Sequence, residues 1–139
     1  MKNILVLCTG NSCRSQIAHG YLKHFAQEKA TIYSAGIETH GVNPKAVAIM
    51  KQDGVDISQN TSNNVSEYLD IDFDFIITVC DHAHENCPYI PSKNAKRIHQ
   101  NFFDPSKIIG SEEQTFNAFK KARIQIKAFC EEFVAKELG

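Results

Sequence analysis

The chain has 139 residues, with 15 basic and 16 acidic side chains and a formal net charge of −1. That length is typical of one domain, residues 1–139, built around a single core. The charges are scattered, with no basic run that could follow a nucleic-acid backbone or an anionic membrane surface, so we expect neither partner.

The apolar run at the N-terminus is too short for a signal peptide or a membrane span and leads directly into glycine and asparagine. Five cysteines are an odd number and too sparse for a disulfide-stapled fold. Since thiols stay reduced in the cytosol, we expect a cytoplasmic protein, which we take to be a monomer.

Apolar runs of strand length alternate with segments of helical period along the chain, a pattern typical of an α/β fold with a parallel sheet. The predicted strands are residues 4–8, 31–35, 73–80 and roughly 96–102. The first helix follows the turn 10–12, and the second begins at Asn43-Pro44 and ends at Gly54. The last helix begins at Ser111, where Gln114 completes a capping box. Its core-facing side is predicted to carry Phe116, Phe119, Ile126, Phe129, Cys130, Phe133 and Val134.

Cys8 ends the first predicted strand, where open α/β sheets bind ligands. The N–H groups of the following loop and of the helix start can form an anion cradle, and Arg14 adds a fork of donors for a tetrahedral oxyanion. The same positive field is expected to lower the pKa of Cys8 below about 8.5, and Ser15 could donate to the thiolate. The alternative is a buried structural cysteine near a surface arginine. The expected oxyanion-binding residues are Thr9, Gly10, Asn11, Ser12, Cys13 and Arg14.

Asp104 is the candidate general acid. Transfer of a tetrahedral anion to a thiolate needs an acid that protonates the departing oxygen, and Pro105 keeps Asp104 out of helical backbone. The alternative is an ordinary turn.

A second cysteine, Cys80, ends the third predicted strand. If this strand lies beside the first, Cys8 and Cys80 are about 5 Å apart, within the range of about 4.4–6.8 Å between disulfide Cα atoms. Cys87 follows seven residues later, and a helix there would hold it about 10 Å from Cys80, so a disulfide between them would require unwinding. Zinc binding by Cys80, His82, His84 and Cys87 and two inert thiols are the alternatives. Cys13 and Cys130 are expected to be structural.

Four segments together resemble the thioredoxin-coupled arsenate reductases, which are built on the low-molecular-weight protein tyrosine phosphatase fold. They are the loop CTGNSCRSQ, the stretch SAGIETHGVNP at residues 34–44, the segment TVC…ENCP and Asp104-Pro105. The resemblance implies a four-stranded parallel sheet of order 2-1-3-4, flanked by helices.

The resemblance also implies a sequence of thiol reactions without a cofactor. Cys8 attacks arsenate, held by Arg14 and the loop, with Ser15 supporting the thiolate and Asp104 assisting the leaving oxygen. Cys80 attacks Cys8, arsenite leaves, and Cys87 attacks Cys80 to form a disulfide that thioredoxin reduces. Phosphate or sulfate would mimic the oxyanion.

Two positions depart from this pattern. Members with a structural potassium ion use Asn11, Ser34 and Thr61 together with two carboxylates, which are replaced here by His19 and Asn63, so we predict no bound metal.

The first rival function is hydrolysis of phosphotyrosine or a small phosphate ester by Cys8, Arg14 and Asp104. Phosphatase relatives usually have proline at the position of Gln16 and aromatic residues where Ser106-Lys107 stand, which disfavours a phosphotyrosine specialist. A phosphoryl carrier would need no acid or extra cysteines, and an oxidant sensor would need no Arg14.

Overall fold

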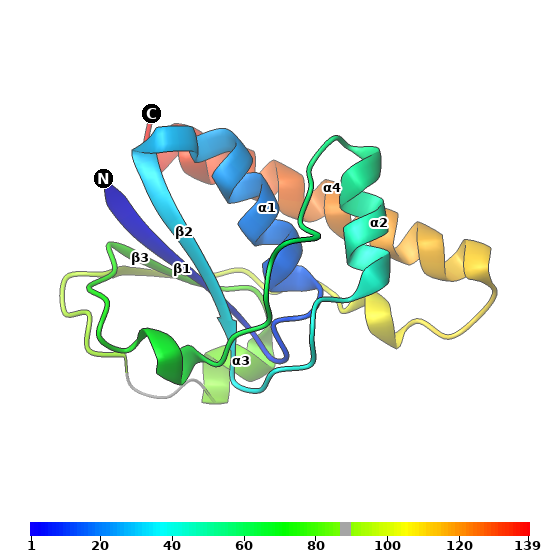
Figure 1. The fold of residues 1–139 in the computed structure, drawn as a ribbon, viewed down its shortest axis with the longest axis horizontal. Coiled ribbons are helices and arrows are strands. Elements are labelled where there is room, and N and C mark those ends of the chain that lie inside the picture. The colour runs from blue at the N-terminus through cyan, green and yellow to red at the C-terminus, as the bar shows by residue number, and fades with distance from the viewer. Residues whose placement is uncertain (87–89) are drawn as a thin grey trace.

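The protein is built on one parallel β-sheet. The computed structural model describes residues 1–86 and 90–139 (Figure 1). The strands are β1 (Lys2–Cys8), β2 (Ala30–Gly36), β3 (Phe75–Thr78) and β4 (Lys96–His99), and their spatial order is β2-β1-β3-β4. All three pairings are parallel. The predicted α/β class, parallel sheet and strand order are therefore confirmed.

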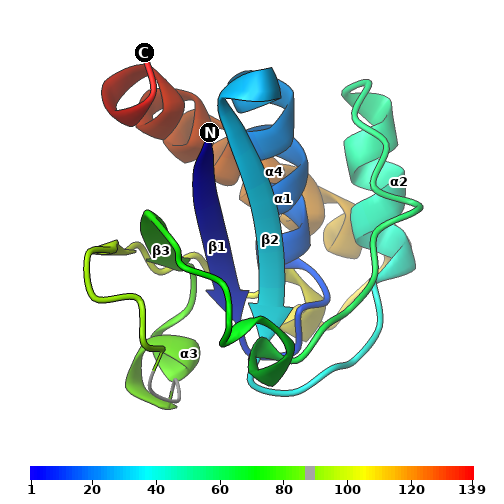
Figure 2. The same ribbon diagram turned by 60° about the vertical axis from the view of Figure 1, so that its left-hand side comes forward.

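Helices cover the sheet unequally. The helices are α1 (Arg14–Ala26), α2 (Pro44–Gln52), α3 (Asp81–Asn86) and α4 (Glu112–Glu137), with 3₁₀ turns η1 (Gln27–Lys29), η2 (Val65–Tyr68) and η3 (Pro105–Lys107). Figure 2 shows α1, α2 and α4 gathered on one side of β1 and β2, with the short α3 near the ends of the strands. Among the described helices none is long and apolar enough to cross a membrane.

Local sequence signals place two helix starts as predicted. Asn43 accepts a hydrogen bond from Lys45 N at 2.8 Å and precedes Pro44, so α2 begins with a capped first turn. Ser111 and Gln114 each cap the other's backbone, which confirms the capping box of α4.

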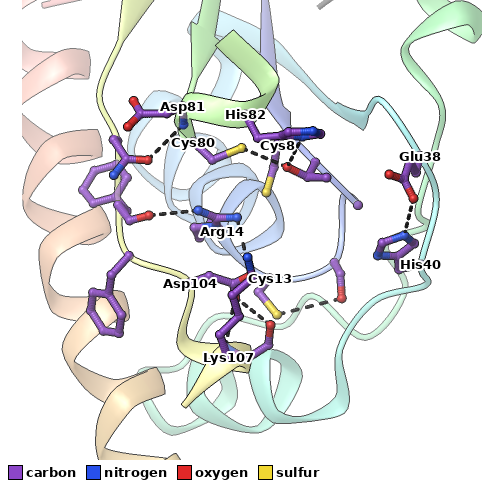
Figure 3. A pocket seen from close by; sticks show the side chains of 17 residues that line it. Cys8, Cys13, Arg14, Glu38, His40, Cys80, Asp81, His82, Asp104 and Lys107 are labelled. Atoms are coloured by element: carbon purple, nitrogen blue, oxygen red, sulfur yellow. Dashed lines mark hydrogen bonds and ion pairs between the residues drawn. The ribbon is translucent and has the colours of Figure 1, made fainter. Parts of the chain in front are cut away.

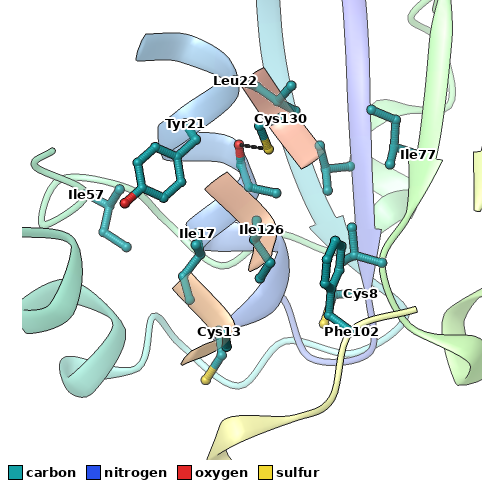
Figure 4. Packing of buried hydrophobic residues seen from close by; sticks show 14 of the residues in the cluster. Cys8, Cys13, Ile17, Tyr21, Leu22, Ile57, Ile77, Phe102, Ile126 and Cys130 are labelled. Carbon is teal, nitrogen blue, oxygen red and sulfur yellow. Dashed lines mark hydrogen bonds between the residues drawn. The ribbon is translucent and has the colours of Figure 1, made fainter. Parts of the chain in front are cut away.

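The central strand β1 is buried on both faces, and its residues alternate between them. Ile4, Val6 and Cys8 belong to the cluster packed under α1 and α4, whereas Leu5 and Leu7 belong to the cluster on the opposite face. Figure 4 shows Cys8 at the edge of the first cluster, close to Phe102. The period of two thus directs the Cys8 side chain toward α1.

Three expectations about the elements need correction. The third strand ends at Thr78, two residues before Cys80, because after Val79 N donates to Leu7 O the chain turns into α3. The fourth strand ends at His99, since the chain leaves the sheet edge there. Phe116 is 39% exposed rather than part of the core, and Figure 1 shows the first turns of α4 extending past the sheet.

Candidate active site

The loop between β1 and α1 turns its carbonyl oxygens outward. They accept hydrogen bonds from the segment after β2, from Glu38 N to Thr9 O at 2.9 Å, from His40 N to Gly10 O at 3.0 Å and from Asn43 N to Ser12 O at 3.1 Å. Among the described residues, no N–H group of residues 10–13 donates to a backbone carbonyl. Those N–H groups stand at the N-terminus of α1, so they suit an anion.

Gly36 allows β2 to approach this loop closely. A Cβ atom there would collide with Thr9 O and Asn11 N. The loop can therefore lie against the end of β2 only because residue 36 has no side chain.

Asn11 sets the bend of the loop. Its φ is 47°, in the left-handed region that asparagine tolerates better than most residues, and its side chain is fully buried. Asn11 Oδ1 accepts from Ser15 Oγ at 2.7 Å, while Asn11 Nδ2 donates to Ser34 O at 3.1 Å. The conformation is thus fixed by hydrogen bonds on both sides of the amide.

Gln16 braces the same turn from α1 and is fully buried. Its Nε2 donates to Asn11 O at 3.2 Å, to Asn11 Oδ1 at 3.1 Å and to Thr61 O at 3.0 Å, and its Oε1 accepts from Asn60 Nδ2 at 3.0 Å. The sequence offered Gln16 only as a contrast with phosphatases. Its hydrogen bonds connect the loop to residues more than 40 positions away, which no local pattern indicates.

A cavity of about 720 Å³ opens over the loop. Figure 3 shows Cys8, Arg14 and Cys80 converging on it, with Asp104 beside Arg14. Both sulfurs belong to buried residues, since Cys8 is 4% exposed and Cys80 is 2% exposed. The expected nucleophile, the arginine, the acid and the second cysteine therefore meet at one place.

Arg14 is oriented by a backbone carbonyl and a carboxylate. Its Nη1 donates to Phe102 O at 3.0 Å, and its Nη2 lies 3.5 Å from Asp104 Oδ2. Within the described residues its Nε is buried without a hydrogen-bond partner. A buried donor left in this state is costly, and an oxyanion in the cavity would satisfy it.

Asp104 faces the cavity from the cap position just before η3. Its Oδ1 accepts from Ser106 N at 3.0 Å and from Ser106 Oγ at 2.6 Å, which leaves Oδ2 directed toward Arg14. The side chain is 20% exposed. It can reach both water and a bound oxyanion.

The thiols of Cys8 and Cys80 lie side by side at the cavity and affect each other's pKa. Cys80 Sγ also contacts Thr9 Oγ1 at 3.3 Å and accepts from Ala83 N at 3.4 Å. The interaction with Cys8, then the contacts with Thr9 and Ala83, lower the pKa of Cys80. The interaction with Cys80, together with burial, raises the pKa of Cys8 although Arg14 and the backbone N–H of Ser15 oppose the rise. Cys80 is therefore the more acidic thiol of the two.

This pair corrects two expectations. The pKa of Cys8 was predicted to fall, and it rises because the charge of the pair resides on Cys80. The Ser15 hydroxyl was expected to donate to the thiolate, but it donates to Asn11, and the Ser15 backbone N–H reaches Cys8 instead.

Of the other described cysteines, Cys13 lies in the loop and lines the cavity, whereas Cys130 is buried in the core. Burial raises the pKa of Cys13 to about 11 and raises that of Cys130, whose Sγ lies 3.7 Å from Ala18 O in the core. Cys87 is outside the described residues, so its predicted role stays a prediction.

The side chains proposed for metals have other contacts. His82 lies 3.2 Å from Thr9 Oγ1, whereas His84 stacks on His99, so the two histidines of the zinc alternative do not converge. Asn11 Oδ1 is occupied by donors, and His19 Nδ1 contacts Ser34 Oγ at 2.7 Å. The residues present therefore do not fit an oxygen cage for potassium.

Known proteins with similar sequences include arsenate reductases. The chain is 46% identical over 134 residues to an arsenate reductase of Halalkalibacterium halodurans, with 94% of this chain and 96% of the relative covered. It is 42% identical over 132 residues to an arsenate reductase of Bacillus subtilis, covering 95% and 94% of the two chains.

Solved structures of similar proteins also include an arsenate reductase. An arsenate reductase in its phosphate-binding state superposes with a TM-score of 0.74 at 30% identity, covering 98% of both chains. The fold is shared with Vibrio vulnificus Wzb in complex with benzylphosphonate, at a TM-score of 0.81 and 22% identity, covering 97% of this chain and 98% of that one. Residues 3–138 match the model of one family, so the chain belongs to the low molecular weight phosphotyrosine protein phosphatase family.

Proposed function

We propose that the protein reduces arsenate to arsenite, using Cys8, Cys80 and Cys87 in succession. The observation that carries this proposal is that the Cys8 and Cys80 thiols meet in one cavity, which the anion loop and Arg14 also line. Reduction of arsenic(V) to arsenic(III) takes two electrons, and two thiols that become a disulfide supply two. Ester hydrolysis needs only one thiol, so a second one in the same cavity favours the reductase. Relatives that carry the name arsenate reductase support the choice.

In the first step Cys80 accepts the proton of the Cys8 thiol, and the resulting Cys8 thiolate attacks the arsenic atom. Arg14 and the loop N–H groups hold the remaining oxygens, in the manner of an oxyanion hole. Asp104 gives its proton to the departing oxygen, which leaves as water. The product is a covalent bond between Cys8 Sγ and arsenic(V).

In the second step Cys80 attacks Cys8 Sγ, and the pair of electrons from the sulfur–arsenic bond passes to arsenic. Arsenite leaves, and a Cys8–Cys80 disulfide remains. Cys87 then attacks Cys80, which restores the Cys8 thiolate. Thioredoxin, the reductant we propose, returns the Cys80–Cys87 disulfide to thiols.

The need for reduced thiols indicates the compartment in which the protein works. Among the described cysteines Cys8, Cys13, Cys80 and Cys130 are free thiols, and the reaction consumes reduced thiols. We place the protein in the reducing cytoplasm, acting as a single-domain monomer.

Arsenite production by the purified protein with thioredoxin, thioredoxin reductase and NADPH tests the proposal. We expect arsenate-dependent NADPH oxidation that Cys8→Ser abolishes. Cys130→Ala is the matched control, because Cys130 lies in the core between α1 and α4, away from the cavity. If the wild type shows no arsenate-dependent NADPH loss while it hydrolyses phosphate esters rapidly, the reductase proposal is wrong.

Cys87→Ser tests the last step separately. Without Cys87 the Cys8–Cys80 disulfide has no internal thiol to resolve it, so we expect at most one turnover and accumulation of that disulfide, detected by mass spectrometry of peptides. Sustained turnover in this variant would remove Cys87 from the mechanism.

Phosphate-ester hydrolysis is a second candidate because Cys8, Arg14 and Asp104 face one another across a cavity that also fits phosphate. Cys80→Ser separates the two activities. We expect this variant to lose arsenite production altogether but to keep measurable hydrolysis of p-nitrophenyl phosphate.

A further inference from the structure

Before the second step of the proposed reaction, the attacking sulfur, Cys80 Sγ, carries a proton. Cys80 holds the proton it took from Cys8, and a protonated thiol is a poor nucleophile. Cys8 cannot take it back, because its sulfur is then bonded to arsenic. A route for this proton must therefore lead away from the pair.

The contacts of Cys80 provide one such route. Cys80 Sγ lies 3.3 Å from Thr9 Oγ1, and Thr9 Oγ1 lies 3.2 Å from His82 Nδ1. Figure 3 shows His82 beside Cys8 and Cys80 at the rim of the cavity. His82 is exposed, so a proton that reaches its ring can pass on to water.

We propose that His82, acting through the hydroxyl of Thr9, takes up the proton of Cys80 as Cys80 attacks Cys8. This inference rests on the proposed arsenate reduction and adds a residue to it. The Cys80 thiol proton moves to Thr9 Oγ1, and the hydroxyl proton of Thr9 moves to His82 Nδ1. At the same time Cys80 Sγ bonds to Cys8 Sγ, the sulfur–arsenic bond breaks, and its electron pair reduces arsenic.

Histidine is suited to this position. A neutral imidazole with its hydrogen on Nε2 presents Nδ1 as an acceptor, so it can take a proton on one nitrogen and release one to water from the other. His82 does not touch the sulfur, so it is a positioning residue for the proton rather than part of the sulfur chemistry.

Helix α3 holds His82 in place at its first turn. Asp81 N donates to Asn101 Oδ1 at 3.0 Å, and Asp81 Oδ1 lies 2.6 Å from His99 Nε2 on β4. Asn86 Nδ2 donates to the carbonyl of His82 at 2.9 Å. The backbone that carries His82 is thus tied to β4 and to the segment after it, while the ring contacts Thr9.

Other ionisable groups face His82 from every side of the cavity. Cys8, Cys80 and Arg14 lie on its inner side, and Asp81 precedes it on α3. Across the mouth of the cavity, Glu38 Oε2 lies 2.9 Å from His40 Nε2. Asp104 and Lys107 form the far wall. Among the described contacts, the Thr9 hydroxyl meets Cys80 Sγ and His82 Nδ1 and none of the other groups named here. A change confined to His82 therefore tests the proton route through Thr9.

The first test needs no arsenate. In a Cys8→Ser background we measure alkylation of Cys80 by iodoacetamide against pH, quantified on the Cys80 peptide by mass spectrometry. If His82 accepts the proton, adding His82→Ala raises the apparent pKa of the thiol by about one unit and lowers the alkylation rate by about tenfold at pH values below that pKa. Adding His84→Ala is the matched control, because His84 lies on the same helix and contacts Thr78 rather than Thr9. Superimposable curves for the parent and His82→Ala would overturn the proposal.

The second test follows arsenite release in a single turnover, with Cys87→Ser as the parent. We expect His82→Ala to slow release by about 100-fold, to flatten the pH dependence of the release rate, and to recover when free imidazole is added to the buffer. Slower release that keeps the parent's pH dependence and does not respond to imidazole would assign His82 a purely structural role and refute the inference. If no variant releases arsenite, the reductase proposal fails, and the alkylation profile still decides the role of His82.

Discussion

Replacement of Gln16 by glutamate is the sharpest test of how the anion loop is held. The change keeps the size of the side chain but removes both N–H donors of the amide. Asn11 O and Thr61 O then lose a hydrogen bond, whereas Asn11 Oδ1 keeps the one from Ser15. Asn11 O is buried, so its lost partner costs about 1–3 kcal/mol, whereas the carbonyl of exposed Thr61 can turn to water, and we expect a loss of about 1–3 kcal/mol in the free energy of unfolding.

Urea denaturation at 25 °C measures that loss, and calorimetry of sulfate binding measures its effect on the loop. Because Gln16 supports the left-handed turn at Asn11, we expect Gln16→Glu to weaken sulfate binding at least tenfold, about 1.4 kcal/mol. Gln114→Glu is the matched control, since that amide is exposed and glutamate caps a helix equally well. We expect it to change stability by less than about 0.5 kcal/mol. A similarly small change in Gln16→Glu would refute the bracing role.

Three further predictions concern charge. Because the contacts of Cys80 lower its pKa, thiolate absorbance at 240 nm should be present at pH 7, disappear in acid, and be reduced in Cys80→Ser. Burial lowers the pKa of His19 to about 4 from about 6.5, so the unfolded chain binds the extra proton and wild-type stability falls as the pH drops from 6.5 to 4. Denaturation should show a decline about 2–3 kcal/mol larger than in His19→Asn, and parallel curves would contradict this. Arg14→Lys loses the fork that contacts Phe102 O and should weaken sulfate binding by at least about tenfold in calorimetry, whereas unchanged affinity would exclude Arg14 from the cradle.

The features that the sequence predicted correctly are those encoded over a few neighbouring residues. The caps of α2 and α4 depend on side chains within three residues of the backbone they satisfy. The alternation of β1 depends on the pleat alone, and it placed Cys8 at the strand end beside the loop. Local chemistry therefore predicted the sheet, the loop and the candidate nucleophile.

The features that the sequence could not predict depend on contacts between distant segments. Thr9 and His82 are separated by 73 positions, and no sequence pattern near either residue indicates that they are in contact. The pKa of Cys8 was predicted in the wrong direction for the same reason. The positive field of the loop can be inferred from the loop itself, whereas the opposing contact with Cys80 exists only because β3 lies beside β1.

Strand register connects the fold to the choice between one-thiol and two-thiol chemistry. Leu7 is paired with Thr78, so Val79 is level with Cys8, and both fall in the cluster under α1 and α4. On a continuing strand the next side chain, Cys80, would point to the opposite face. The strand ends at Thr78 instead, and Ala83 N of α3 donates to Cys80 Sγ, so Cys80 lies in the same cluster as Cys8. The anion cradle fixes only what is attacked, whereas this register and the early end of β3 bring a second thiol to the sulfur that attacks it.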